Sequence, residues 1–241
     1  MIFSGDNLPR ALGLLQFPKD TDVAPSLAQI TYEKMRSDII FGVLAPSTRL
    51  RLEELRSRYG VSVPTLREVL SRLGSEGLVV AEDQRGCAVS PISEANLREL
   101  AALRALIEVH ALERSFQVGD VEWKSQVVAA HHKLSRIEQA MIAGDACDRT
   151  EWKRYDSGFH HALIKGCGST ELLAVHGSVF DRYLRYQMVY LTFRGQIAAD
   201  EHQGLLEAAL ERDVERGKAI LLHHIEDGVA HALKMHAAQQ A

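Results

Sequence analysis

The chain has 241 residues, of which 46% are hydrophobic and 25% are charged, and its formal net charge is −4. Such a composition fits a globular protein with one large domain or two modest ones. No apolar run reaches the roughly 18 residues that a membrane span requires, and the N-terminus lacks the pattern of a signal peptide. We therefore expect a cytoplasmic protein that does not contact membranes. The three cysteines are far apart in the chain and form no Cys-x-x-Cys motif, so the sequence suggests neither a disulfide framework nor a thiolate zinc site.

The charge is unevenly distributed along the chain. Residues 25–92 carry nine Lys/Arg and eight Asp/Glu, whereas residues 93–241 carry 17 and 21. Residues 1–24 contain glycines and prolines but no sustained hydrophobic period, which predicts a flexible arm. The sequence thus predicts an arm at 1–24, a weakly basic domain at 25–92 and an acidic domain at 93–241. A near-neutral domain can still present one positive face to DNA phosphates.

Residues 25–92 have the pattern of a winged helix-turn-helix. Apolar residues at helical spacing predict three helices, at about 30–41, 52–59 and 62–74. Two short apolar runs, 78–81 and 87–89, flank a polar turn that contains Gly86, which indicates a β-hairpin. A hairpin directly after a helix-turn-helix is expected to be the wing of a DNA-binding domain.

The third of these helices is predicted to read DNA. A recognition helix lies in the major groove, and its first turn contacts base edges. Ser62 and Thr65 can bond to phosphates or bases, and Arg67 can donate two hydrogen bonds to guanine. The alternative is that they are an N-cap, an early polar residue and a solvated arginine. Arg72, one turn further on, is assigned either to a phosphate contact or to a surface charge.

From Ser93 onward no strand signal occurs. Caps and glycines separate helical periods at about 94–118, 121–143, 148–167, 170–194, 199–212 and 214–237. The predicted fold class is therefore mainly α, with an N-terminal winged helix-turn-helix and a C-terminal all-α bundle.

Four polar side chains lie on the apolar stripes of these later helices, where they are expected to point inward. They are Asp156, His160, His202 and His224. Asp156 and His160 are one helical turn apart, and His224 is preferred to the adjacent His223 because it is aligned with Leu221. Three nitrogens and one carboxylate oxygen suit a divalent metal such as zinc, nickel or manganese. Satisfied core histidines are the alternative at this stage.

Arg104 lies on the apolar stripe of the 94–118 helix, so its guanidinium is predicted to point into the bundle. Its partner is either Glu108, four residues on, or the carboxylate of a bound ligand that the metal coordinates at its other end. Three residues of the 170–194 helix are further candidates for an effector pocket, with a core or surface role as the alternative: His176, Tyr183 and Arg185.

These motifs carry a family resemblance. Gly60-Val-Ser-Val-Pro-Thr-Leu-Arg-Glu-Val-Leu70, followed by Arg72-Leu73, Glu76-Gly77-Leu78 and Arg85-Gly86-Cys87-Ala88-Val89, resembles the winged helix of the GntR family of bacterial regulators. Asp156-x-x-x-His160, Glu201-His202 and His223-His224-Ile225 resemble the metal-carrying FCD (FadR-like) sensor domains, in particular the six-helix VanR-like group. The sequence has Val63 where the family usually has an arginine, so the operator sequence cannot be inferred.

The resemblance implies a homodimeric repressor that binds a palindromic operator and responds to a small organic acid held beside a divalent metal, with zinc preferred. It also implies that the wing tip, Arg85 and Gly86, lies against the minor groove or phosphates. The alternatives are a metal-responsive regulator and a metal-dependent enzyme acting on a small carboxylate. An enzyme is not expected, because we find no His-Glu-x-x-His motif and no further inward carboxylate to act as a general base.

Overall fold

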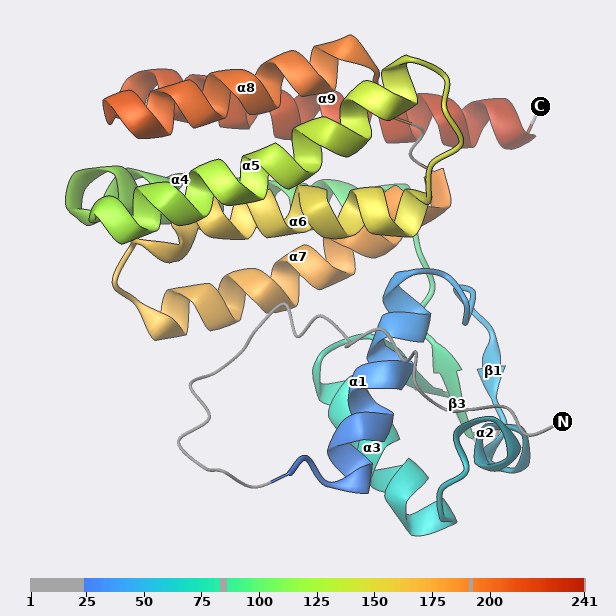
Figure 1. Cartoon of the computed structure of the whole chain (residues 1–241). Helices are drawn as coiled ribbons and strands as arrows, with labels where there is room; N and C mark the ends of the chain where they lie inside the picture. The colour runs from blue at the N-terminus through green and yellow to red at the C-terminus, as the bar shows by residue number, and fades with distance from the viewer. Residues whose placement is uncertain (1–23, 83–85, 191–192, 241) are drawn as a thin grey trace, which may run out of the picture. The chain divides into compact units, whose positions relative to one another are not determined.

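The computed structural model describes residues 24–82, 86–190 and 193–240. They form two compact units, one containing the described chain up to Ile39 and Val43–Ser90, the other containing Ile40–Gly42 and the chain from Pro91 onward (Figure 1). All but the last residue of the predicted arm at 1–24 lies outside the described residues. None of the described helices is long and apolar enough to cross a membrane.

The first unit consists of three helices and a small antiparallel sheet. Its elements are α1 (Leu27–Ile40), β1 (Arg49–Leu50), α2 (Leu52–Tyr59), α3 (Val63–Ser75), β2 (Val79–Glu82) and β3 (Gly86–Val89). The strand order is β1-β3-β2, and Val80 pairs with Ala88 in the predicted hairpin. The sequence did not predict β1, because two residues are too few for a strand pattern and this strand exists only through its pairing with β3.

The turn between α2 and α3 follows from local signals. Gly60 ends α2 in the left-handed conformation, with φ of 66°, which favours glycine. The Ser62 side chain accepts a hydrogen bond from the Thr65 amide, and Pro64 occupies the first turn of α3, where its missing amide hydrogen costs nothing. Leu66 and Leu73 of α3 are fully buried, so the opposite face of the helix, with Arg67, faces solvent.

The second unit is a bundle of six helices, and the predicted fold class is confirmed. The helices are α4 (Glu94–Val118), α5 (Val121–Ile142), α6 (Arg149–Lys165), α7 (Thr170–Tyr190), α8 (Gln196–Glu211) and α9 (Val214–Gln240). The serine or aspartate before α4, α5 and α6 caps each helix through its side chain. Helix α7 ends earlier than predicted, and α8 starts earlier, directly after Gly195.

The core of the bundle combines apolar side chains with a cluster of buried polar ones. Helix α4 packs against α6, α7 and α9, and α5 packs against α6 and α8. Phe116, Phe159, Leu163 and Leu205 are fully buried among these helices. Several ionisable side chains are as deeply buried as these apolar ones, and such burial is unfavourable unless each charge has a partner.

Candidate metal centre

The structure brings together the four side chains that the sequence proposed as metal ligands. Asp156 and His160 come from α6, His202 from α8 and His224 from α9, and their ligand atoms all lie within 4.8 Å of one another. Each residue is at most 7% exposed. The neighbouring His223 has a side chain that is 65% exposed and lies 3.4 Å from Asp227.

Each of the three imidazoles is oriented by a carboxylate. The pairs, measured from Nδ1 to the nearest carboxylate oxygen, are His160–Glu108 at 2.6 Å, His202–Glu138 at 2.9 Å and His224–Glu201 at 2.6 Å. A carboxylate that accepts a hydrogen bond from Nδ1–H leaves the lone pair of Nε2 available. Histidines that bind a metal commonly have such a carboxylate partner.

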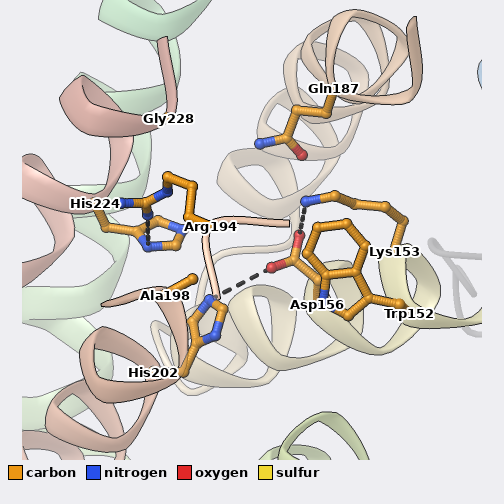
Figure 2. A pocket seen from close by; sticks show the side chains of 9 residues that line it. All are labelled: Trp152, Lys153, Asp156, Gln187, Arg194, Ala198, His202, His224 and Gly228. Atoms are coloured by element: carbon orange, nitrogen blue, oxygen red, sulfur yellow. Dashed lines mark hydrogen bonds and ion pairs between the residues drawn. The ribbon is translucent and has the colours of Figure 1, made fainter. Parts of the chain in front are cut away.

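The inward nitrogens are therefore those with the fewest partners. His160 Nε2 is buried and has no hydrogen-bond partner among the described residues. His202 Nε2 lies 3.4 Å from Asp156 Oδ1, a charge contact without the alignment of a hydrogen bond (Figure 2). Buried polar atoms seldom lack partners, and a divalent cation at this point would satisfy both nitrogens and the carboxylate. The residues present fit a metal ion.

Basic side chains balance most of the buried carboxylates. Arg104 Nε donates to Glu108 at 2.6 Å, Lys153 Nζ donates to Asp156 at 3.1 Å, and the Arg194 guanidinium pairs with Glu201 at 3.1 Å. Glu138 is different, because its Oε2 atom is buried without a hydrogen-bond partner among the described residues.

The protonation of the site also suits a cation. Burial alone would raise the pKa of Asp156, but Lys153 and the nearby His202 outweigh burial and hold that pKa well below its ordinary value. Burial would lower the pKa of His202, yet Asp156 and Glu138 raise it to about 9. A proton on His202 thus neutralises these carboxylates in the absence of metal. Burial lowers the pKa of His224 to about 3, so this imidazole is neutral and able to ligate.

Sequence reasoning missed Glu138, Lys153 and Arg194, and the expectation of no further inward carboxylate was wrong. The signal for Glu138 was present, because it continues the buried stripe of α5 at helical spacing after Val127 and Leu134.

Three of the four predicted effector residues lie around Glu108. Arg104 is 1% exposed and pairs with Glu108, the within-helix alternative that the sequence left open. His176 Nε2 lies 3.4 Å from Glu108 Oε2, and the Tyr183 ring lies 4.9 Å from the Arg104 guanidinium. Arg185 is also buried.

A small cavity lies next to Asp156, and Figure 2 shows the side chains that line it. Its volume is about 20 Å³, enough for a water molecule. It is lined by Trp152, Lys153, Asp156, Gln187, Arg194, Ala198, His202, His224 and Gly228. None of the four predicted effector residues lines it.

The predicted DNA-binding residues of the first unit differ in how exposed they are. Ser62 and Arg67 are exposed at the start of α3, and Thr65 is half-buried beside them. Arg72 stacks on the Tyr32 ring at 3.5 Å and donates to Gln29 at 2.7 Å, so it is tied to α1. Gly86 is exposed at the start of β3 with φ of 92°, and Arg85 lies outside the described residues.

A winged helix-turn-helix followed by a helical domain with a polar centre is the architecture of a two-domain DNA-binding transcriptional regulator. The model of the bacterial regulatory proteins of the gntR family matches residues 27–89, and the FCD domain model matches residues 99–227. The chain belongs to the GntR family and carries an FCD domain, and it is a regulator rather than an enzyme.

Similar proteins include two curated regulators. The chain is 36% identical over 208 residues to the uncharacterized HTH-type transcriptional regulator BphR of Paraburkholderia xenovorans (strain LB400), covering 85% of this chain and 84% of that protein. It is 34% identical over 206 residues to the HTH-type transcriptional repressor GlaR of Escherichia coli (strain K12), covering 80% and 90%.

Solved structures show the same fold. E. coli McbR/YncC superposes with a TM-score of 0.75 at 17% identity, covering 88% of this chain and all of that one. A GntR regulator from Rhodococcus sp. RHA1 gives 0.73 at 23% identity, covering 87% and 99%.

Proposed function

We propose that this regulator is a repressor whose operator binding is controlled by a small organic acid bound beside a divalent metal ion. The observation that carries the proposal is the set of three buried histidines, each oriented by a carboxylate, whose inward nitrogens converge with Asp156. Three nitrogens and one oxygen favour zinc, with nickel or manganese as alternatives.

The proposed metal site lies where ligand binding can change the arrangement of the helices. The four metal ligands come from α6, α8 and α9, so the site ties together three helices that are far apart in the sequence. A bound metal would supply an open coordination position for a carboxylate oxygen. A ligand that binds one arrangement of these helices better than another shifts the population towards that arrangement, and this shift is what reaches the DNA-binding unit.

On DNA, α3 is proposed to lie in the major groove. Its exposed first turn presents Ser62 and Arg67, with Thr65 beside them. The wing tip at Arg85 and Gly86 would contact the minor groove or the phosphates, and Arg72 is left as a phosphate contact at most, because it is already bound to α1.

A homodimer on a palindromic operator is supported by exposed apolar side chains on two neighbouring helices. Leu106 and Leu103 on α4 are 70% and 39% exposed, and Val175 on α7 is 52% exposed. Helices α4 and α7 pack against each other, so a second copy of the chain would cover both.

The test is operator binding by purified protein, measured with and without metal and with and without small carboxylic acids. Release from the operator that requires both metal and acid supports the proposal. Release by metal alone favours the second candidate, a metal-responsive regulator, for which the buried ligand set itself is the supporting observation. His202→Ala should lower the metal content and abolish the response, and full metal occupancy in this variant would refute the ligand assignment.

A further inference from the structure

Three polar groups around the cavity beside Asp156 have hydrogen-bonding capacity that the described residues leave unused. Trp152 Nε1 and Gln187 Oε1 are buried without a hydrogen-bond partner among the described residues. Lys153 is 4% exposed, and its ammonium, which can donate three hydrogen bonds, makes one to Asp156 and otherwise lies 4.0 Å from the Trp152 ring. All three residues line the same cavity (Figure 2).

The metal ion does not account for these groups. An ammonium and an indole N–H can only donate hydrogen bonds, so neither ligates a cation, and the ammonium repels one. When Asp156 coordinates a metal ion, its carboxylate attracts the Lys153 ammonium less strongly, and Lys153 has no other carboxylate hydrogen-bond partner among the described residues. Both donors therefore call for an acceptor that arrives with the ligand, and a carboxylate accepts from two donors at once.

Gln187 adds a requirement of the opposite kind. Its Oε1 needs a donor, which a simple carboxylate does not carry. A hydroxyl supplies this donor without charge, whereas an amino group would bring a third cationic group next to Lys153 and Arg194, which both line the cavity.

We infer that the effector is a hydroxycarboxylic acid whose carboxylate is held by Lys153 and Trp152 and whose hydroxyl donates to Gln187. The inference rests on the proposed function, since it assigns the acid of that same site. The cavity of about 20 Å³ holds only a water-sized group, so a larger acid enters by displacing lining side chains on α6, on α7 or between α7 and α8. This displacement couples the ligand to the packing of the bundle.

The test compares acids that differ by one hydroxyl. Isothermal titration of the full-length, zinc-loaded protein uses lactate against propionate and malate against succinate. The hydroxy acid should bind about tenfold more tightly than its partner, as expected for one buried hydrogen bond that is otherwise left unmade. Gln187→Leu should remove this difference, and Lys153→Met should weaken both members of each pair by about tenfold or more. The matched controls are Lys165→Met and Gln203→Leu, which change exposed residues and should have no effect.

A proton–nitrogen correlation NMR spectrum of the unsubstituted, isotope-labelled protein provides a readout that does not depend on a variant. The chain has two tryptophans, and Trp123 Nε1 already donates to the Ala162 carbonyl oxygen at 2.9 Å. The hydroxy acid should shift the indole N–H signal of Trp152 and leave that of Trp123 in place. Trp152→Phe assigns the signal.

The outcomes separate this inference from the proposed function. If no acid binds the zinc-loaded protein, the acid-responsive function itself is wrong. If acids bind equally well to the unsubstituted protein and to Lys153→Met with unchanged zinc content, or leave the Trp152 signal in place, the assignment of the carboxylate is overturned while the function stands. Equal binding of the two members of each pair overturns the hydroxyl assignment.

Discussion

Glu138 on α5 accepts a hydrogen bond from His202 Nδ1 on α8 at 2.9 Å, and both side chains are 1% exposed. The carboxylate fixes the tautomer and orientation of the imidazole, and it raises the basicity of the inward nitrogen. It is therefore part of the proposed metal centre although it does not touch the metal.

Removing this carboxylate should weaken metal binding. Glu138→Ala is expected to lower zinc affinity about 10- to 100-fold, which is the usual effect of removing the hydrogen-bond partner of a metal-binding histidine. Competition with a chelating dye measures this affinity. Glu138→Gln keeps an acceptor for Nδ1–H and should lose less. Glu122→Ala on the exposed face of α5 is the control. Unchanged zinc affinity in a folded Glu138→Ala protein would contradict this role.

Arg67→Ala tests the DNA-reading face. Loss of a bidentate arginine contact to guanine costs about 1–3 kcal/mol, so affinity for a selected operator should fall by roughly 5- to 150-fold while binding to random DNA changes less. Fluorescence anisotropy at fixed salt measures both. Arg98→Ala, an exposed arginine of the second unit, should leave both affinities unchanged. Equal losses on operator and random DNA would make Arg67 a phosphate contact instead.

Leu106→Glu tests the dimer proposal. A charge at Leu106, the most exposed of the apolar side chains named on α4 and α7, should split the dimer, because a buried unpaired carboxylate is unfavourable. Light scattering after size-exclusion chromatography should then give a mass near 26.8 kDa. Val118→Glu, an exposed position at the end of α4, serves as the control. A variant that keeps the mass of a dimer would place the interface elsewhere.

The sequence predicted those parts of the protein that depend on local pattern. Helix caps such as Ser62 and inward positions such as His160 are set within a few residues, so periodicity finds them. What it could not find depends on which helix faces which. Glu138 was on a recognisable buried stripe, but its contact with His202 joins residues 64 positions apart. The sequence pattern of α5 does not show that α8 packs against it.

The cavity was beyond sequence reasoning for the same reason. Lys153 is adjacent to an aromatic residue on α6 and looks like a solvated lysine, whereas in the folded protein it is 4% exposed. It lines the cavity together with Gln187 of α7 and Ala198 of α8, which are 34 and 45 positions further along the chain. Arg104 could be placed on the inner face, yet periodicity alone could not choose between Glu108 and a ligand as its partner.

Tyr32 makes the stability of the DNA-binding unit depend on pH. Its hydroxyl donates to Glu76 Oε1 at 2.6 Å, and burial, reinforced by this bond, raises the pKa of Tyr32 from 10.0 to about 12. A raised pKa stabilises the folded state below pH 10, and this contribution is lost as the pH rises from 10 through 12. Tyr32→Phe should therefore lower stability by about 1 kcal/mol at pH 7 and flatten the fall above pH 10, as measured by urea denaturation. A variant that keeps the full alkaline fall would assign it to another group.

Arg104→Met distinguishes the two roles that the sequence allowed for this arginine. Its guanidinium donates to Glu108 at 2.6 Å with both side chains 1% exposed, so removing it leaves a buried carboxylate held only by His160 and His176. We expect a loss of about 3–5 kcal/mol in the free energy of unfolding of metal-free protein, measured by denaturation without any effector. Arg104→Met combined with Glu108→Gln should recover part of this loss, because the unpaired charge is then absent. An arginine that served only to bind a ligand would leave the ligand-free stability unchanged, and that result would return Arg104 to the effector pocket.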